Sequence, residues 1–201
     1  MKNIILVGAG GHCKSCIDVI EKEKKFKIVG LVDNKKKTGK FLKYRILGKD
    51  YNLKKFRNIA KYALVTVGQV KNYSTRVKLF NKLISLNFKV PCIISPISNV
   101  SKHSTVEKGT IIMHGCIINA GSVIGKNCII NTRSIIEHDV SIGSNCHIST
   151  GVIINGGAKI GNNTFIGSGV VIKNNISIGK NCIIGMKIII KKDIADNEII
   201  K

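Results

Sequence analysis

The strongest pattern in the chain is an aliphatic residue at every sixth position of the C-terminal half. The series runs without insertion or skip from Ile94 to Ile190, and all seventeen positions are Ile or Val. A fixed period of six predicts a parallel β-helix, in which each hexad forms one edge of a three-sided coil. Residues 94–195 should therefore form between five and six coils around an aliphatic column.

The remaining hexad positions agree with this interpretation. Small or β-branched residues usually stand four positions after each aliphatic residue, as a narrow interior requires. Four cysteines share this second inward position, and we expect them in the core: Cys116, Cys128, Cys146 and Cys182. Gly or Asn often follows the aliphatic residue directly, and we expect these residues to supply the backbone angles of the corners.

Before Pro91 the pattern changes to short apolar runs that alternate with segments of helical spacing. Residues 2–7, 27–32 and 62–67 are predicted strands, and residues 13–24 and 74–87 are predicted helices. This alternation indicates an α/β unit with a short parallel sheet. We divide the chain into an α/β domain over 1–91 and an all-β domain over 92–201.

The carboxyl ends of the predicted parallel strands are the place to look for a ligand. The first strand ends in a glycine-rich turn, and free N–H groups at the start of the next helix favour an anion there. Cys13 replaces the third glycine of the dinucleotide pattern, so a tight turn without a ligand explains the spacing equally well. Asp33 and Asn34 end the second strand, where polar side chains commonly meet a ribose or base.

Charge adds only a general preference for anionic ligands. Lys and Arg number 33 against 11 Asp and Glu, giving a net charge of +22, most of it within residues 1–91. A basic surface attracts polyanions such as nucleotides or coenzyme A, although Lys as the ordinary surface residue of this chain explains most of the excess. The basic residues form no block with interleaved aromatics, so we expect no nucleic-acid binding.

Hydropathy and cysteine usage favour a cytoplasmic protein. The apolar run over residues 4–7 is far too short for a membrane span or a signal peptide, so we expect no membrane association. The seven cysteines include one C-x-x-C pair, Cys13 and Cys16, and no second pair that would complete a metal site. We therefore expect reduced thiols and no metal.

The whole chain resembles the hexapeptide-repeat sugar acetyltransferases, within them the group of sialic-acid O-acetyltransferases and nucleotide-4-amino-sugar N-acetyltransferases. The hexad repeat, the GAGGH turn over 8–12, and the segments 130–132 and 136–139 carry the resemblance. It implies a left-handed β-helix, a homotrimer, acetyl-CoA as co-substrate and a nucleotide-sugar substrate. Cys13, and Met186 with Lys187 in place of a small pair, depart from the group's pattern.

The resemblance also implies roles for individual residues. His138 would be the general base in a direct attack on the thioester, Asp139 would orient it, and Asn131 would support the site. His147, Ser168 and Met186 would contact the coenzyme. The nucleotide-sugar site would comprise Gly10, Gly11, His12, Asp33, Asn34, Gly68 and Gln69.

The leading function implied by the resemblance is acetyl-CoA-dependent N-acetylation of the 4-amino group of a nucleotide-linked amino sugar. Two other functions remain open from the sequence. One is O-acetylation of sialic acid or a related nonulosonic acid, which differs only in the acceptor atom. The other is a non-enzymatic β-helix scaffold, as in ice-binding solenoids, but the repeat lacks the outward array of Thr that such a surface needs. The short first domain and the incomplete glycine pattern argue against a nicotinamide oxidoreductase.

Overall fold

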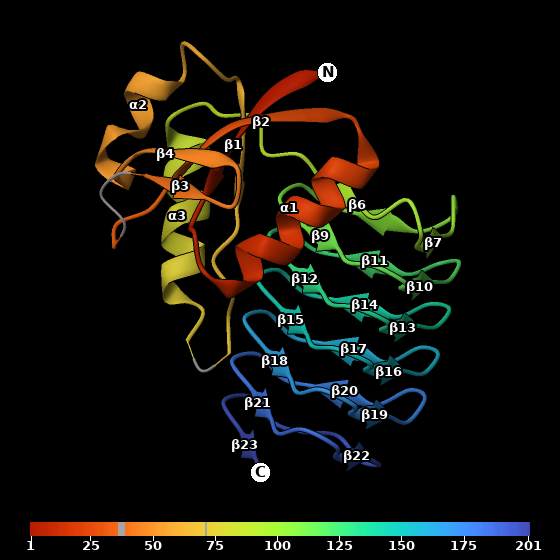
Figure 1. Cartoon of the computed structure of the whole chain (residues 1–201). Coiled ribbons are helices and arrows are strands. Elements are labelled where there is room, and N and C mark those ends of the chain that lie inside the picture. The colour runs from red at the N-terminus through yellow and green to blue at the C-terminus, as the bar shows by residue number, and fades with distance from the viewer. Residues whose placement is uncertain (36–38, 71) are drawn as a thin grey trace.

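The computed structural model describes residues 1–35, 39–70 and 72–201. An α/β unit lies against one side of the upper coils of a three-sided prism, and the C-terminus lies at the far end of that prism (Figure 1). A five-stranded sheet in the order β3-β4-β2-β1-β5 forms the centre of the α/β unit. Its strands are β1 (Lys2–Val7), β2 (Phe26–Val32), β3 (Lys40–Phe41), β4 (Tyr44–Gly48) and β5 (Tyr62–Val65). Its helices are α1 (Gly11–Glu23), the 3₁₀ helix η1 (Asp50–Asn52), α2 (Leu53–Phe56) and α3 (Ser74–Ser85).

The predicted α/β unit is confirmed, with four additional short elements. β1 pairs in parallel with β2 and β5, as the strand–helix alternation predicts. Four short elements were not predicted from the sequence: β3, β4, η1 and α2, which have two, five, three and four residues. Elements this short show no clear period, and packing of Phe41, Ile46 and Leu53 into the core stabilises them.

The prism consists of two-residue strands that pair only in parallel, with partners one coil apart, as Ile117 with Ile135. The docked sheet, which faces the α/β unit, contains β6 (Ile93–Ile94), β9 (Ile111–Ile112), β12 (Ile129–Ile130), β15 (His147–Ile148), β18 (Phe165–Ile166), β21 (Ile183–Ile184) and β23 (Ile199–Ile200). The open sheet contains β7 (Asn99–Val100), β10 (Ile117–Ile118), β13 (Ile135–Ile136), β16 (Ile153–Ile154), β19 (Val171–Ile172) and β22 (Ile189–Ile190). The polar sheet contains β8 (Thr105–Val106), β11 (Val123–Ile124), β14 (Ser141–Ile142), β17 (Lys159–Ile160) and β20 (Ser177–Ile178).

The predicted aliphatic column fills the prism. Its members are buried from Ile112 through Ile190. Ile94, Val100 and Val106 are only half-buried, because no further coil covers the first one. The rigid column fixes the positions of the corners, where the side chains of interest lie.

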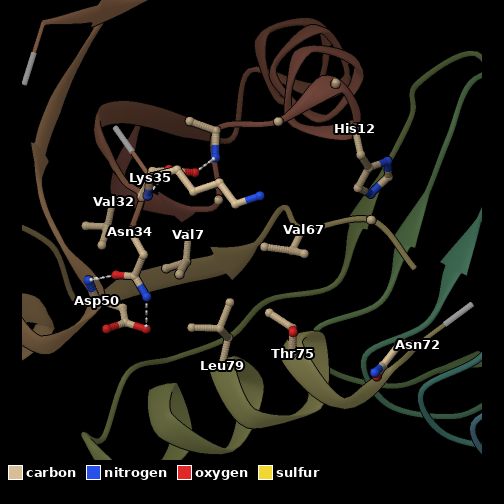
Figure 2. Close-up of a pocket in the computed structure, with 16 residues that line it drawn as sticks. Val7, His12, Val32, Asn34, Lys35, Asp50, Val67, Asn72, Thr75 and Leu79 are labelled. Carbon is tan, nitrogen blue, oxygen red and sulfur yellow. Dashed lines mark hydrogen bonds between the residues drawn. The ribbon is translucent and has the colours of Figure 1, made fainter. Parts of the chain in front are cut away.

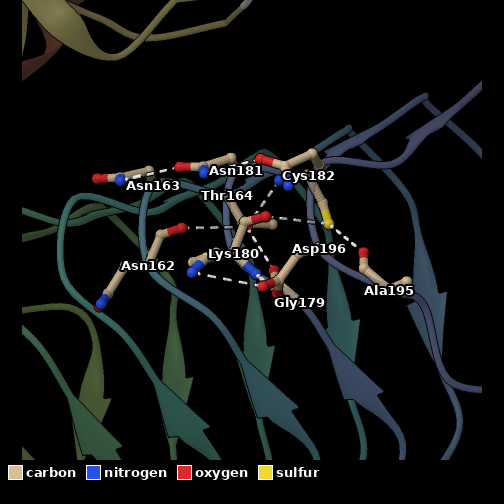
Figure 3. A network of polar contacts seen from close by, with 10 residues as sticks. Asn162, Asn163, Thr164, Gly179, Lys180, Asn181, Cys182, Ala195 and Asp196 are labelled. Atoms are coloured by element: carbon tan, nitrogen blue, oxygen red, sulfur yellow. Dashed lines mark hydrogen bonds and ion pairs between the residues drawn. The ribbon is translucent and has the colours of Figure 1, made fainter.

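The four cysteines predicted in the core are buried and free. Figure 3 shows how one of them joins two coils: the Cys182 thiol donates to the carbonyl oxygen of Ala195 at 3.0 Å, and its backbone N–H donates to Thr164 Oγ1 at 3.1 Å. Thr164, in the same hexad position, donates in turn to the carbonyl oxygen of Gly179 at 2.9 Å. Small polar side chains in this position therefore provide hydrogen-bond partners for backbone N–H and C=O groups of neighbouring coils.

The prediction for the corners is wrong in its position. Positive φ angles occur three residues after the aliphatic residue, for example at Asn127 (57°) and Gly115 (69°). Gly143, which follows the aliphatic residue directly, does not have one. A Cβ at Gly143 would lie 2.5 Å from Asn162 Oδ1 and 3.0 Å from the carbonyl carbon of Gly161 in the next coil. These glycines are needed for close approach of successive coils rather than for backbone angle.

The two parts of the chain share a core. Ile93, Ile111 and Ile129 point outward from the docked sheet, yet they are fully buried against the α/β unit. Ile17 and Ile20 of α1 belong to the same cluster. This contact places the N-terminal end of α1 beside the docked sheet, where the candidate site lies.

Candidate functional site

A cavity of about 570 Å³ opens at the carboxyl ends of β1, β2 and β5 (Figure 2). The turn Gly8–His12 lines it on one side, and Val67, Gly68, Thr75 and Leu79 line it on another. Cβ atoms at Gly10 or Gly11 would meet nothing within 4 Å, so the backbone of the turn borders open space. No side chain caps the start of α1, which leaves its first N–H groups available to an anion.

The end of β2 shapes the opposite wall of this cavity. Asp33 accepts hydrogen bonds from the backbone N–H of Ala9 at 2.7 Å and of Lys35 at 2.8 Å, which ties the glycine-rich turn to β2. Asn34 exchanges two hydrogen bonds with Asp50, at 2.9 and 3.0 Å. In Figure 2 the Lys35 side chain extends into the cavity, so a cation faces the helix start. These features together suit a phosphorylated ligand.

A second cavity, of about 470 Å³, lies between α1, the segment after β5 and the corner at the end of the docked sheet. It shares Gly11, His12 and Gly68 with the first cavity, so the two meet at these residues. The rest of its lining is mostly polar: Ser15, Gln69, Val70, Asn131, Thr132, His147 and Thr150. Hydroxyl and amide groups in such a cavity suit a sugar.

His147 is held in one neutral form within this second cavity. Its Nδ1 contacts the carbonyl oxygen of Gln69, which can only accept, so Nδ1 carries the proton. Nε2 is then the acceptor for the Asn131 side-chain amide at 3.3 Å. Burial, and next the positive charge of Arg76, lower the pKa of His147 to about 4, although the bond to Gln69 acts in the opposite direction.

His12 is a second neutral histidine at the junction of the cavities. Its Nε2 lies 3.3 Å from the Cys16 thiol in the next turn of α1. Burial lowers its pKa to about 3, with further contributions from Arg76 and His147. Neither imidazole therefore adds positive charge near pH 7.

His138 and Asp139 lie on a different corner, between the open and polar sheets, and line neither cavity. His138 Nδ1 donates to Asp139 Oδ2 at 2.9 Å, and both side chains are about two-thirds exposed, at 68% and 71%. Because Nδ1 carries the proton of this hydrogen bond, Nε2 keeps a free lone pair, and it lies beside Gly156. This geometry is suitable for a general base.

The structure brings together only some of the expected site residues. Asn131 contacts His147 and lies on the corner between the docked and open sheets, so within one chain it does not contact His138. Ser168 and Met186 follow on Asn131's corner in later coils; Ser168 contacts Ser149 at 2.9 Å, and Met186 is 73% exposed. The residues expected to bind a nucleotide sugar line the two cavities: Gly10, Gly11, His12, Asp33, Asn34, Gly68 and Gln69.

Several residues of the site were missed from the sequence. Lys35, Ser15 and Thr150 come from three separate segments that no motif marks, and Thr132 lies in the segment 130–132 that carries the resemblance but had no role assigned to it. Arg76 did carry a signal, because it shares the buried helical face of α3 with Leu79, Phe80 and Leu83. A charged residue within an apolar stripe indicates a buried polar role.

His114 joins the two parts of the chain. It donates from Nε2 to Asp18 of α1 at 2.6 Å and accepts from Ser95 at 2.6 Å. Within residues 1–35, 39–70 and 72–201, no group of three or more His, Cys, Asp or Glu is arranged to hold a metal ion. In the same residues, no helix combines the length and apolar character that crossing a membrane requires.

Comparisons with known proteins match both parts of the chain. The PglD N-terminal domain model matches residues 3–83, and the model of bacterial transferase hexapeptide (six repeats) matches residues 121–156 and 157–187. No protein with a curated description matches the chain by sequence.

Solved structures show the same left-handed β-helix with an α/β unit. A mutant of perosamine N-acetyltransferase from Caulobacter crescentus, in complex with CoA and GDP-perosamine, has a TM-score of 0.93 and 26% identity over 99% of this chain and 93% of that one. The acetyltransferase domain of PglB from Neisseria gonorrhoeae FA1090, in complex with acetyl coenzyme A, has a TM-score of 0.93 and 25% identity over 98% of this chain and 95% of that one. WeeI from Acinetobacter baumannii AYE shares the fold at 16% identity, with a TM-score of 0.66 over 100% of this chain and 97% of that one.

Proposed function

Because the chain belongs to the hexapeptide-repeat acyltransferases that carry a PglD N-terminal domain, we propose that it transfers an acetyl group from acetyl-CoA to the 4-amino group of a nucleotide-linked sugar. The observation that carries the proposal is the meeting of the two cavities at Gly11, His12 and Gly68. One cavity suits a nucleotide and the other a sugar. Structural neighbours with CoA and GDP-perosamine, or with acetyl coenzyme A, support both substrates.

In this proposal the α/β domain, residues 1–91, binds the nucleotide. The uncapped start of α1 and Lys35 face the diphosphate, while Asp33 holds the turn in shape. The sugar extends past His12 into the hydroxyl-lined cavity. The β-helix domain, residues 92–201, supplies the acetyl-CoA groove near Ser168 and Met186. In this proposal the reaction takes place in the cytoplasm, where acetyl-CoA is available.

The transfer itself is a direct attack on an activated thioester. His138 Nε2 takes a proton from the sugar amine as the amine nitrogen forms a bond to the thioester carbonyl carbon. The carbon–sulfur bond then breaks, and the proton passes from His138 to the leaving thiolate, giving the amide and free coenzyme A. Asp139 accepts the hydrogen bond from Nδ1 and so holds the imidazole in place.

A second copy of the chain completes the site in this proposal. Asn131 and the sugar cavity lie on one corner and His138 on the next, so one chain alone does not assemble them. The open sheet between these corners presents a ladder of outward aliphatic side chains: Ile117, Ile135, Ile153, Val171 and Ile189. Covering this ladder in a homotrimer would bring the His138 of one chain to the sugar cavity of another.

Thiol release from acetyl-CoA with a panel of acceptors tests the proposal. The panel contains UDP- and GDP-linked 4-amino sugars, the free amino sugar and free sialic acid. We expect turnover with a nucleotide-linked amine and a loss of roughly 100-fold or more in kcat for His138→Asn. His103→Asn, an exposed histidine of the first coil, is the matched control and should keep full activity. Turnover with hydroxyl acceptors only, or full activity of His138→Asn, would contradict the proposal.

A further inference from the structure

Arg76 of α3 is a fully buried cation at the junction of the two domains, with 0% of its surface exposed. Its Nη1 donates to the carbonyl oxygens of Val65 and Val67, each at 2.9 Å, and its Nε donates to that of Asn127 at 3.1 Å. None of the ion pairs among the described residues includes it. Burial lowers the pKa of Arg76 to about 10, so the guanidinium stays charged near neutral pH.

The three carbonyl oxygens belong to two separate parts of the chain. Val65 ends β5, and Val67 lies in the segment that follows it and lines the first cavity. Asn127 lies on the β-helix corner between the polar and docked sheets. A single side chain therefore connects α3, the end of β5 and a β-helix coil.

The segment held by Arg76 is also held from its other end. The Gln69 side chain donates to the carbonyl oxygen of Asn145 at 2.9 Å, and its backbone carbonyl accepts from His147. Between these two anchors lies Gly68, which lines both cavities. The relative position of the cavities thus depends on how segment 65–69 sits against the β-helix.

Arg76 does not line the first cavity, although it belongs to a helix that does. Its helix neighbours Thr75 and Leu79 line the first cavity, as Figure 2 shows, whereas Arg76 points to the β-helix. A buried charge without a counter-ion is costly, and the cost is larger here because Nη2 of Arg76 has no hydrogen-bond partner among the described residues. This cost indicates that the contacts of Arg76 contribute something other than stability.

We propose that Arg76 is a positioning residue of the transfer: by holding segment 65–69 against the β-helix, it keeps the nucleotide and sugar cavities in line, so that the acceptor amine reaches the reacting centre. This inference rests on the proposed acetyl transfer. Arg76 does not contact the substrate. Nucleotide binding alone, which uses the turn after β1 and the end of β2, should depend on it far less than turnover does.

The test compares Arg76→Met and Arg76→Lys with wild type at a temperature where all are folded. For Arg76→Met we expect kcat for the nucleotide sugar to fall roughly 100-fold, the size expected for a misplacement of about 1 Å. Nucleotide diphosphate binding, measured by calorimetry with UDP and GDP, and the KM for acetyl-CoA should stay near wild type. Arg76→Lys keeps the charge and one or two of the three hydrogen bonds, so it should recover part of kcat.

Leu83→Ala is the matched control, because Leu83 is fully buried on α3 and lines neither cavity. It should lower the melting temperature without lowering kcat. The inference is overturned if the Arg76 variants keep wild-type kcat, or if Leu83→Ala loses as much kcat as Arg76→Met. A wild-type chain that transfers no acetyl group overturns the proposed function itself, which is a separate and recognisable result. Gln69→Ala, which releases the other end of the segment, provides an independent variant if Arg76→Met does not fold.

Discussion

His138 occupies the space that a side chain at Gly156 would need. A Cβ at Gly156 would lie 2.6 Å from His138 Nε2 and 2.7 Å from its Cε1. Gly156 lies one coil further along the same corner, and its φ angle is not positive, so the requirement is for room rather than for backbone freedom. The absent side chain lets the imidazole lie beside Asp139 with Nε2 accessible.

Gly156→Ala should therefore lower activity without unfolding the protein. The added methyl group displaces the imidazole from the position in which Asp139 holds it, and we expect kcat to fall about 10- to 100-fold. Steady-state kinetics and thermal melting together check this. Asn174→Ala, exposed on the same corner one coil further on, is the control and should change neither quantity. A Gly156→Ala enzyme with wild-type kcat would show that the position of His138 in this structure is not the active one.

Gly143→Ala should destabilise the β-helix itself. The added Cβ would meet the backbone and side chain of Asn162 in the next coil at 2.8 and 2.5 Å, and two-residue strands cannot shift independently of their neighbours. Overpacking of this kind costs about 1–3 kcal/mol or more in the free energy of unfolding. Urea denaturation measures the loss. Lys173→Ala, an exposed residue in the same hexad position, should leave the unfolding midpoint unchanged.

His147 should make the protein less stable in acid. Its pKa is about 4 when folded against an ordinary value of 6.5, so between these pH values the unfolded chain binds a proton that the folded chain does not. Stability is complete above pH 6.5 and falls as the pH drops towards 4, by roughly 3 kcal/mol from this one group. Urea unfolding at pH 7, 5.5 and 4 measures the slope, and His147→Asn should flatten it. An unchanged slope would mean that His147 is not held neutral.

Ile153→Glu should break up the proposed homotrimer. Ile153 is the middle member of the aliphatic ladder on the open sheet, and burial of an unpaired carboxylate there opposes association. Light scattering should report a monomer with its circular dichroism retained and its acetyl transfer lost. Lys159→Glu on the polar sheet introduces the same charge and should stay trimeric. A wild-type chain that is monomeric and active would refute assembly of the site between chains.

The β-helix could be predicted from the sequence in detail, because its period depends only on neighbours along the chain. The seventeen aliphatic positions and Cys182 were placed correctly from spacing alone. The role of Gly143 was not, because its constraint comes from a coil that lies eighteen residues away and is invisible in any single hexad. The α/β sheet was predicted in outline, and the strands that were missed depend on tertiary packing.

The candidate site was predicted less completely, because it joins segments with no common pattern. The resemblance singled out Asn131 and His138 together, whereas in one chain Asn131 contacts His147. That pairing follows from which corner each residue occupies, and a motif does not contain this information. Arg76 lies in the helix predicted over 74–87, and its place among apolar residues indicates a buried side chain, but no role for it follows from the sequence.

The eighteen-residue spacing between partner strands from β6 to β22 limits how this architecture can change in length. Deleting a single hexad would rotate every later residue by a third of a turn, so the side chains of one face would move to another. Deleting three hexads together would shorten the prism and keep each face intact. Among the regular coils we therefore expect changes in length as whole coils, which would let the prism vary in steps while the corner that carries His138 keeps its orientation. The last coil is shorter, since Ile183 pairs with Ile199 only sixteen residues on, and only a coil at the end of the prism has no further coil to keep in register.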